Sequence, residues 1–284
     1  MIPGEPIRSK PIRGKPLRRR LILSRLAAGG SAILWTFLTD RNGSVALATP
    51  PRVAPWRSPP LIILDPGHGG YDPGATGVTG SLEKDITLAS ALTLKAYLES
   101  AGRYRVELTR TADSYVGCED RVDIARELGA SLFLSMHADK LSDPSVRGAS
   151  VYTLANQASD AETEALADRE NGPAPGEDSP TGRVPEILAS LAARANRMAS
   201  SRIAHQLASD MGRDLPVLPQ PERHANFAVL HSAGIPSVLI EMGFLSNPAD
   251  EASLNDPGHR ELIARSVTRA VDAWFATVRD GGPV

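Results

Sequence analysis

Residues 61–74 read Leu61-Ile62-Ile63-Leu64-Asp65-Pro66-Gly67-His68-Gly69-Gly70-Tyr71-Asp72-Pro73-Gly74. Four consecutive apolar residues followed by a glycine-rich turn predict a buried strand with a loop at its carboxyl end. Open α/β sheets carry their chemistry at that edge. A single histidine, His68, lies where the glycines give the backbone most freedom. The stretch therefore predicts a functional site at the end of the strand.

A glycine-rich turn after a strand also suggests nucleotide binding, but the decisive positions do not fit. The dinucleotide fingerprint G-x-G-x-x-G requires glycine where Asp72 stands. The spacing from Gly69 to Gly74 suits a P-loop, but Ala75 replaces the lysine that would bind phosphate. Metal binding or acid–base chemistry by His68 is therefore favoured over phosphate binding.

Beyond this stretch, strands alternate with helices, which predicts a mainly parallel sheet covered on both faces. We expect an α/β fold over residues 61–281: a single three-layer domain with a mostly parallel twisted sheet and flanking helices. The strands are expected at 61–64, 106–109, 131–136, 149–154, 227–230 and 237–240. Helices are expected at 83–100, 119–128 and about 160–170, and three further helices are expected to begin near 187, 196 and 257.

The amino-terminal 48 residues differ in charge from the rest of the chain. They carry a net charge of +7 within a total of −2, which leaves −9 for residues 49–284. A basic region, a short apolar region and the small-residue site Ala46-Leu47-Ala48 predict an export signal over 1–48, cleaved near Ala48. Arg18-Arg19-Arg20 resembles a twin-arginine signal. The alternative is an uncleaved membrane anchor followed by a basic tail.

The charge and cysteine content of the chain exclude or disfavour several kinds of protein. Residues 49–60 are a proline-rich lead-in to the domain. The acidic balance after residue 48 disfavours nucleic-acid binding, and cleavage would leave no stable membrane span. The single cysteine, Cys118, excludes an intramolecular disulfide. The expected product is an exported globular domain.

Polar residues follow three of the expected buried strands. His68, His137 and Glu241 each stand at a strand's carboxyl end, and Glu83 opens the first helix. Two histidines and a carboxylate form the ligand set of an open catalytic zinc site, and a second carboxylate could act as general base. Glu83, at a helix start, suits a fixed ligand, while Glu241, beside Gly243, suits the base. Position alone leaves the two roles open.

Other hydrolytic layouts are missing from the sequence. No histidine is followed by glutamate, so the zinc motif H-E-x-x-H does not occur, and there is no G-x-S-x-G motif of a serine hydrolase. Of the hydrolytic site types considered, the chain contains the residues for a zinc site of two histidines and two glutamates.

Several motifs together resemble one enzyme family. They are Asp65-Pro66-Gly67-His68-Gly69-Gly70, Glu83-Lys84-Asp85, Thr109-Arg110, Ser135-Met136-His137-Ala138-Asp139 and Ile240-Glu241-Met242-Gly243-Phe244-Leu245-Ser246-Asn247. Over about residues 61–279 they resemble the zinc-dependent N-acetylmuramoyl-L-alanine amidases of bacterial cell-wall remodelling. The resemblance implies one Zn²⁺ held by His68, Glu83 and His137, with Glu241 as the catalytic residue. It implies cleavage of the amide between N-acetylmuramic acid and L-alanine in peptidoglycan.

The segment 157–195 resembles the regulatory insert of the division-associated members of that family. It contains an acidic run, then a loop rich in Gly and Pro. The resemblance implies a helix that covers the zinc, with Glu170 as a possible autoinhibitory contact, until an activator protein of the division machinery moves it. It also implies a periplasmic enzyme of a Gram-negative bacterium that separates daughter cells. Asp139 departs from the asparagine of many members and could orient a metal ligand.

Three further residues are candidates for substrate binding: Arg110, His224 and Asn226. Arg110 could bind a stem-peptide carboxylate or pair with Asp113, and His224 is expected in a loop before a strand. Two alternatives to the amidase are a zinc carboxypeptidase or deacetylase of similar architecture and a non-catalytic wall-binding protein. The wall-binding alternative would predict loss of Glu241 or of a ligand, and none is lost.

Overall fold

The computed structural model describes residues 58–172, 186–232 and 234–279. The predicted export signal, most of the proline-rich lead-in and the Gly- and Pro-rich loop of the insert lie outside these residues. Among the helices that are described, none is both long and apolar enough to span a bilayer.

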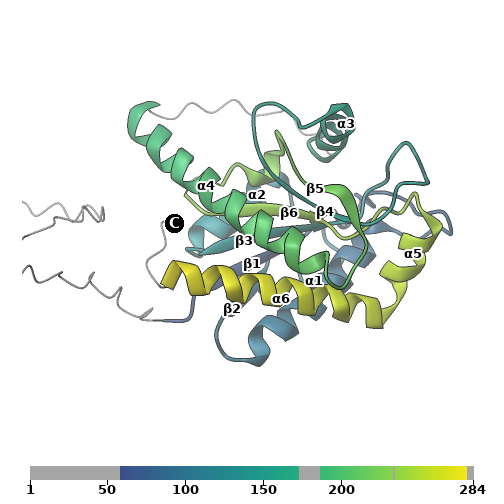
Figure 1. Ribbon diagram of the computed structural model, residues 1–284, viewed down its shortest axis with the longest axis horizontal. Coiled ribbons are helices and arrows are strands. Elements are labelled where there is room, and N and C mark those ends of the chain that lie inside the picture. Colours follow the sequence, from purple (N-terminus) through teal and green to yellow (C-terminus); the bar gives the residue numbers. More distant parts are fainter. Residues whose placement is uncertain (1–57, 173–185, 233, 280–284) are drawn as a thin grey trace, which may run out of the picture. The chain divides into compact units, whose positions relative to one another are not determined.

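A six-stranded sheet organises the described residues, with the strand order β2-β1-β3-β6-β4-β5. Figure 1 shows α4 and α6 lying side by side in front of this sheet. The elements in chain order are β1 (Leu61–Pro66), α1 (Glu83–Ser100), β2 (Arg105–Leu108), α2 (Cys118–Glu127), β3 (Leu132–His137), β4 (Ala149–Leu154), α3 (Ala161–Glu170), α4 (Glu186–Met211), β5 (Val217–Ala225), the 3₁₀ turn η1 (Ala228–Leu230), β6 (Ser237–Glu241), α5 (Pro248–Asn255) and α6 (Pro257–Arg279).

Strand direction brings the predicted site residues to one edge. Strands β2, β1, β3 and β6 are parallel, whereas β4 is antiparallel to β6 and β5 is parallel to β4. The register pairs Pro66 with Met136 and His137 with Glu241. The carboxyl ends of β1, β3 and β6 therefore lie together, as expected for chemistry in a mostly parallel sheet.

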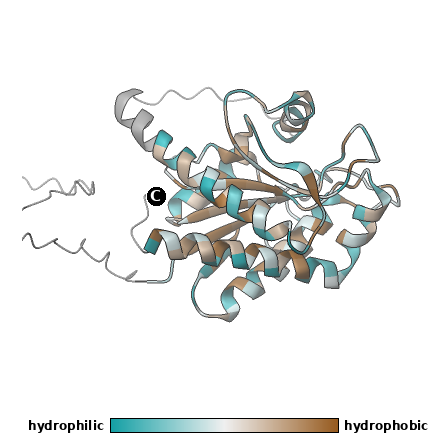
Figure 2. Cartoon of the chain, in the orientation of Figure 1, coloured by the Kyte–Doolittle hydropathy of each residue, from teal (hydrophilic) through white to brown (hydrophobic). Residues whose placement is uncertain are grey.

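The alternation of side chains along the strands divides the apolar core in two. Ile62 and Leu64 face the layer formed by α1, α4 and α6. Leu61 and Ile63 face the other side, where α2, α3 and η1 contribute apolar residues. Figure 2 shows strands that are mostly hydrophobic and helices on which hydrophilic and hydrophobic residues alternate. Because both faces are covered, the sheet strands can be apolar throughout, as the continuous run at 61–64 indicated.

The structure corrects the predicted strand at 227–230. Those residues form η1, and the strand that ends the sheet is β5, which the sequence pattern did not indicate. β5 contains Pro219 and Pro221, which cannot donate ladder hydrogen bonds and are tolerated in an edge strand. The helices expected from 187 and from 196 are one continuous helix, α4, and the short helix α5 was not predicted.

Candidate metal centre

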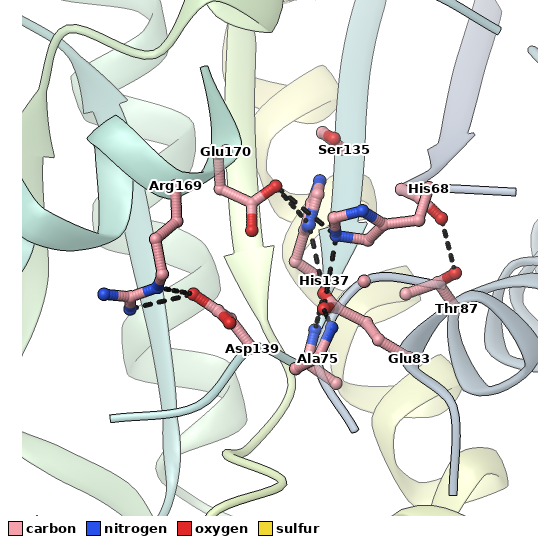
Figure 3. A network of polar contacts seen from close by, with 12 residues as sticks. His68, Ala75, Glu83, Thr87, Ser135, His137, Asp139, Arg169 and Glu170 are labelled. Atoms are coloured by element: carbon pink, nitrogen blue, oxygen red, sulfur yellow. Dashed lines mark hydrogen bonds and ion pairs between the residues drawn. The ribbon is translucent and has the colours of Figure 1, made fainter. Parts of the chain in front are cut away.

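Four side chains from four separate segments converge at the carboxyl edge of the sheet (Figure 3). His68 follows β1, Glu83 begins α1, His137 ends β3 and Glu170 ends α3. One ligand atom from each lies within 4.8 Å of the others. The structure thus brings together the three expected metal ligands and Glu170, the possible autoinhibitory contact.

The distances within this cluster are those of groups that could share one cation. His137 Nδ1 lies 3.2 Å from Glu83 Oε1 and 3.0 Å from Glu170 Oε2. His68 Nε2 lies 3.2 Å from Glu83 Oε2 and 3.5 Å from Glu170 Oε2. His68 Nε2 is buried and makes no hydrogen bond to a described residue. A buried imidazole nitrogen without a hydrogen bond, facing two carboxylates, fits a metal ligand.

Hydrogen bonds fix the orientation of His68 and Glu83. His68 Nδ1 lies 2.9 Å from Asp72 Oδ2, which leaves Nε2 to face the cluster. Glu83 Oε2 accepts from the Ala75 N–H at 2.8 Å, and its Oε1 accepts from the Ala138 N–H at 2.8 Å. Partners of this kind orient metal ligands in proteins. Sequence reasoning did not identify Asp72, although it lies four residues after His68 in the same loop.

The charges of the cluster favour a cation. Burial lowers the pKa values of His68 and His137, but Glu83 and Glu170 outweigh it and raise both. Burial opposes ionisation of the two glutamates, yet the histidines hold the pKa of Glu83 well below its usual range and that of Glu170 at about 2. A site that stabilises protonated imidazoles between two carboxylates also stabilises a metal ion there.

His68 has an uncommon backbone conformation. Its φ of 60° makes it the one non-glycine residue in the left-handed region among those described. Arg121 of α2 stabilises this turn, donating to the His68 carbonyl at 2.9 Å and to the Pro66 carbonyl at 2.8 Å. Arg121 is itself paired with buried Asp65 at 2.7 Å. Strained backbone is retained where the surroundings impose it, often at functional sites.

Arg110 does not lie where a substrate contact would require it. Its guanidinium is buried and donates to the carbonyls of Pro66 and Gly67 at 2.9 Å and of Lys84 at 2.8 Å. Asp113, its other expected partner, hydrogen-bonds to Lys84 at 2.8 Å instead. Arg110 therefore supports the loop that carries His68, and its role in substrate binding stays a prediction.

Gly67 lies against the His137 ring, and this contact yields a prediction. A Cβ at position 67 would lie 2.3 Å from His137 Cε1 and 2.5 Å from Nε2. We expect Gly67→Ala to displace His137 and lower metal affinity by roughly tenfold or more, the usual cost of disturbing a ligand's support. Metal titration with a competing chelator measures this. Gly258→Ala, whose Cβ would meet nothing closer than 3.2 Å, should bind metal normally; equal affinities of the two variants would contradict the prediction.

Glu241 lies beside the cluster and outside its four members. It ends β6 opposite His137 and is fully buried. Its Oε2 accepts from the Asp139 N–H at 3.0 Å, while its Oε1 makes no hydrogen bond to a described residue. Burial, with the nearby charges of Glu83 and Asp139, raises its pKa well above the usual value. A carboxylate of this kind can exchange a proton near neutral pH.

Asp139 contacts the helix that carries Glu170. Its carboxylate binds Arg169, with Nε at 3.0 Å and the terminal nitrogen at 2.9 Å from Oδ2 (Figure 3). Burial and the charges of Glu83 and Glu170 raise its pKa to about 6. The side chain of Asp139 therefore anchors α3, and its role in orienting a metal ligand stays a prediction.

The other two candidates for substrate binding lie apart from the cluster. His224 is in β5, not in a loop; it is exposed, and its Nδ1 lies 3.1 Å from Ser159 Oγ. Because β5 runs opposite to β6, the carboxyl end of β5 is not at the edge that bears His137. Asn226 is exposed, and its carbonyl accepts a hydrogen bond from Asn171, the residue after Glu170. Its role in substrate binding stays a prediction.

A cavity of ≈ 280 Å³ adjoins the cluster. His68, His137 and Glu170 line it, and Tyr71 and Tyr115 are among its other lining residues. A mostly parallel α/β domain with histidines and carboxylates gathered in such a cavity defines a class: an α/β hydrolytic enzyme with a candidate metal centre.

Comparison with known proteins identifies the family. Residues 62–273 match the family model described as N-acetylmuramoyl-L-alanine amidase. Amidase AmiA of Salmonella typhimurium is 35% identical over 224 residues, which cover 76% of each chain. Amidase AmiC of Neisseria meningitidis is 34% identical over 222 residues, covering 77% of this chain and 53% of that protein. The chain belongs to the N-acetylmuramoyl-L-alanine amidase family and is an enzyme of that type.

Solved structures agree with this fold. The amidase AmiC2 of Nostoc punctiforme has a TM-score of 0.59 at 25% identity, covering 77% of this chain and 98% of that one. The amidase CwlD of Clostridioides difficile, solved in complex with the GerS lipoprotein, has a TM-score of 0.58 at 24% identity. The match covers 77% of this chain and 99% of the CwlD chain. The likeness to CwlD supports the fold alone.

Proposed function

We propose that this amidase is zinc-dependent and holds one Zn²⁺ through His68, Glu83 and His137. The observation that carries the proposal is the convergence of three buried ligand atoms, with His68 Nε2 making no hydrogen bond within the part of the chain that the structure describes. The bond cleaved is the amide between N-acetylmuramic acid and L-alanine of the stem peptide in peptidoglycan. Two imidazoles and one carboxylate form a donor set that suits catalytic zinc.

Glu241 is the proposed general base. When bound, zinc would polarise the amide carbonyl and make water a better nucleophile at neutral pH. The Asp139 N–H fixes Glu241 Oε2, which leaves Oε1 to accept a proton from the attacking water. Glu241 then returns that proton to the departing amine of L-alanine, since a group with a raised pKa can act in both directions.

In the resting enzyme, Glu170 occupies the position that water or substrate must reach. Its side chain is only 7% exposed, and Oε2 lies 3.0 Å from His137 Nδ1. The contacts of Arg169 with Asp139 and of Asn171 with the Ala228 N–H hold the end of α3 in place. A carboxylate tethered in this way competes with water and substrate for that position at a high effective concentration. We therefore propose that 61–281 is the catalytic domain and that 157–195 is its regulatory insert.

Relief of this inhibition requires a partner that moves α3. We propose an activator protein of the cell-division machinery, with daughter-cell separation as the process served. Export through a signal in 1–48 would deliver the enzyme to the periplasm of a Gram-negative bacterium. Charge patterning in the sequence supports this location, and the comparison with AmiA and AmiC is consistent with it.

The Arg169–Asp139 pair, which holds the end of α3 in place, gives a test of the proposed autoinhibition. We expect Arg169→Ala to raise basal activity about three- to tenfold, because a charge-assisted contact that holds α3 closed is lost. Turnover of purified sacculi without an activator measures the effect. Arg126→Ala removes an exposed pair with Asp123 on α2 and should leave turnover unchanged. A basal rate for Arg169→Ala at or below that of the wild type would contradict the proposal that this pair holds α3 closed.

Muropeptide analysis tests the proposed reaction. Purified sacculi are digested with the zinc-loaded enzyme, with and without a chelator, and the products are separated. Free stem peptides that begin with L-alanine should appear only with the metal-loaded enzyme. Products of a carboxypeptidase or a deacetylase would instead be shortened peptides or free acetate, with the muramyl amide intact. Release of stem peptides that survives the chelator would contradict zinc dependence.

A further inference from the structure

Two tyrosines stack on each other in the wall of the cavity that holds the metal cluster. The ring centroids of Tyr71 and Tyr115 are 4.4 Å apart, with the planes inclined by 27°. Both line the same cavity as His68 and His137. Tyr71 is nevertheless 59% exposed. An exposed aromatic ring that lines a cavity beside a candidate metal centre is suited to contact a ligand in that cavity.

The two loops that carry these tyrosines are locked together. The Gly70 N–H donates to Asp113 Oδ1 at 2.7 Å, and Lys84 Nζ bridges the Gly70 carbonyl and Asp113 Oδ2 at 2.8 Å each. A Cβ at Gly70, where φ is +61°, would lie 2.7 Å from the Tyr115 nitrogen. The close approach of the loops therefore requires glycine. The tyrosine pair is held in place before a ligand arrives, which reduces the cost of binding.

Tyr71 is also rigidly connected to the metal cluster. It lies in a tight turn closed by two hydrogen bonds between Gly69 and Asp72, at 2.9 and 3.1 Å. Asp72 is the residue that orients His68 through Nδ1. The same short turn thus places an aromatic face and a candidate metal ligand at a fixed separation.

We propose that the Tyr71–Tyr115 pair binds a sugar ring of the glycan strand next to the amide that is cleaved. Aromatic faces suit the C–H faces of a neutral pyranose. The cations near the pair are engaged, Lys84 with Asp113 and Arg121 with Asp65, which favours a neutral sugar over the carboxylates of the stem peptide. The inference rests on the proposed function, because in that substrate the scissile amide is joined to N-acetylmuramic acid itself.

Binding measurements separate this inference from catalysis. The zinc-loaded full chain is titrated with peptide-free glycan strands and, separately, with free stem peptide, both as wild type and with Glu170→Ala to open the cavity. We expect Tyr71→Ala to bind glycan roughly tenfold more weakly, as loss of one stacked ring would cause, and Tyr71→Phe to bind within about twofold of its parent. Affinity for the free stem peptide and zinc content should not change.

Three results would overturn the inference. One is unchanged affinity of Tyr71→Ala for glycan strands, and another is a loss confined to the free stem peptide. The third is a failure of glycan strands to bind either parent chain. None of these readouts requires turnover, so failure of the proposed zinc-dependent cleavage would leave the binding result interpretable.

Discussion

Replacing Glu241 with glutamine is expected to lower kcat on the order of 10³-fold while zinc stays bound. The substitution keeps the shape of a fully buried side chain but removes its ability to accept a proton. General-base catalysis contributes on the order of 10²- to 10⁴-fold in enzymes, which sets the size of the effect. The amide oxygen can still accept the hydrogen bond from the Asp139 N–H, so the end of β6 should keep its conformation.

Three measurements define this prediction. Release of stem peptides from sacculi gives kcat, metal analysis gives zinc content, and thermal unfolding confirms the fold. Glu222→Gln is a matched control, because Glu222 is an exposed carboxylate on β5 that pairs with His205. Should the Glu241 variant lose its zinc, Glu241 would be a metal ligand and its role as base would be wrong.

The second large effect is expected from Glu170→Ala, which should raise basal activity by about 10- to 100-fold. Glu170 makes charge-assisted contacts with both histidines, at 3.0 and 3.5 Å. The closer contact, with His137, contributes about 1.5–3 kcal/mol, and every ~1.4 kcal/mol removed from the closed state corresponds to about tenfold. Removing the side chain therefore shifts α3 toward positions that admit substrate.

The control for this variant lies on the same helix. Glu164→Ala removes an exposed carboxylate of α3 and should leave basal turnover unchanged. Deletion of 157–182 should raise activity as Glu170→Ala does. A folded Glu170→Ala variant that loses both zinc and activity would show that Glu170 is an obligatory ligand, and the autoinhibition proposal would be abandoned.

The positions of the strand ends could be predicted from the sequence because burial leaves a simple pattern. The apolar runs at 61–64 and 131–136 correspond to β1 and β3, and each delivers a histidine at the sheet edge. Parallel pairing then brings these histidines together without further information. The start of α1 at Glu83 was also predicted, because a loop with five glycines from Gly69 to Gly80 precedes a regular helical pattern.

The supporting groups could not be predicted because they depend on contacts between distant segments. Arg121 contacts the His68 carbonyl across 53 residues, and Arg169 contacts Asp139 across 30. Nothing in the local sequence distinguishes these arginines from surface ones. β5 was missed for a different reason. An edge strand need not be continuously apolar, and not all of its N–H groups have to hydrogen-bond to a neighbouring strand. The prolines of β5 therefore made this segment resemble a loop.

The proposed zinc site is tested most directly by diffraction from zinc-loaded crystals at the zinc absorption edge. We predict one anomalous peak per chain within bonding distance of His68 Nε2, Glu83 and His137 Nδ1, with Glu170 completing the site. A peak that leaves out either histidine, or a main site elsewhere in the chain, would contradict the account.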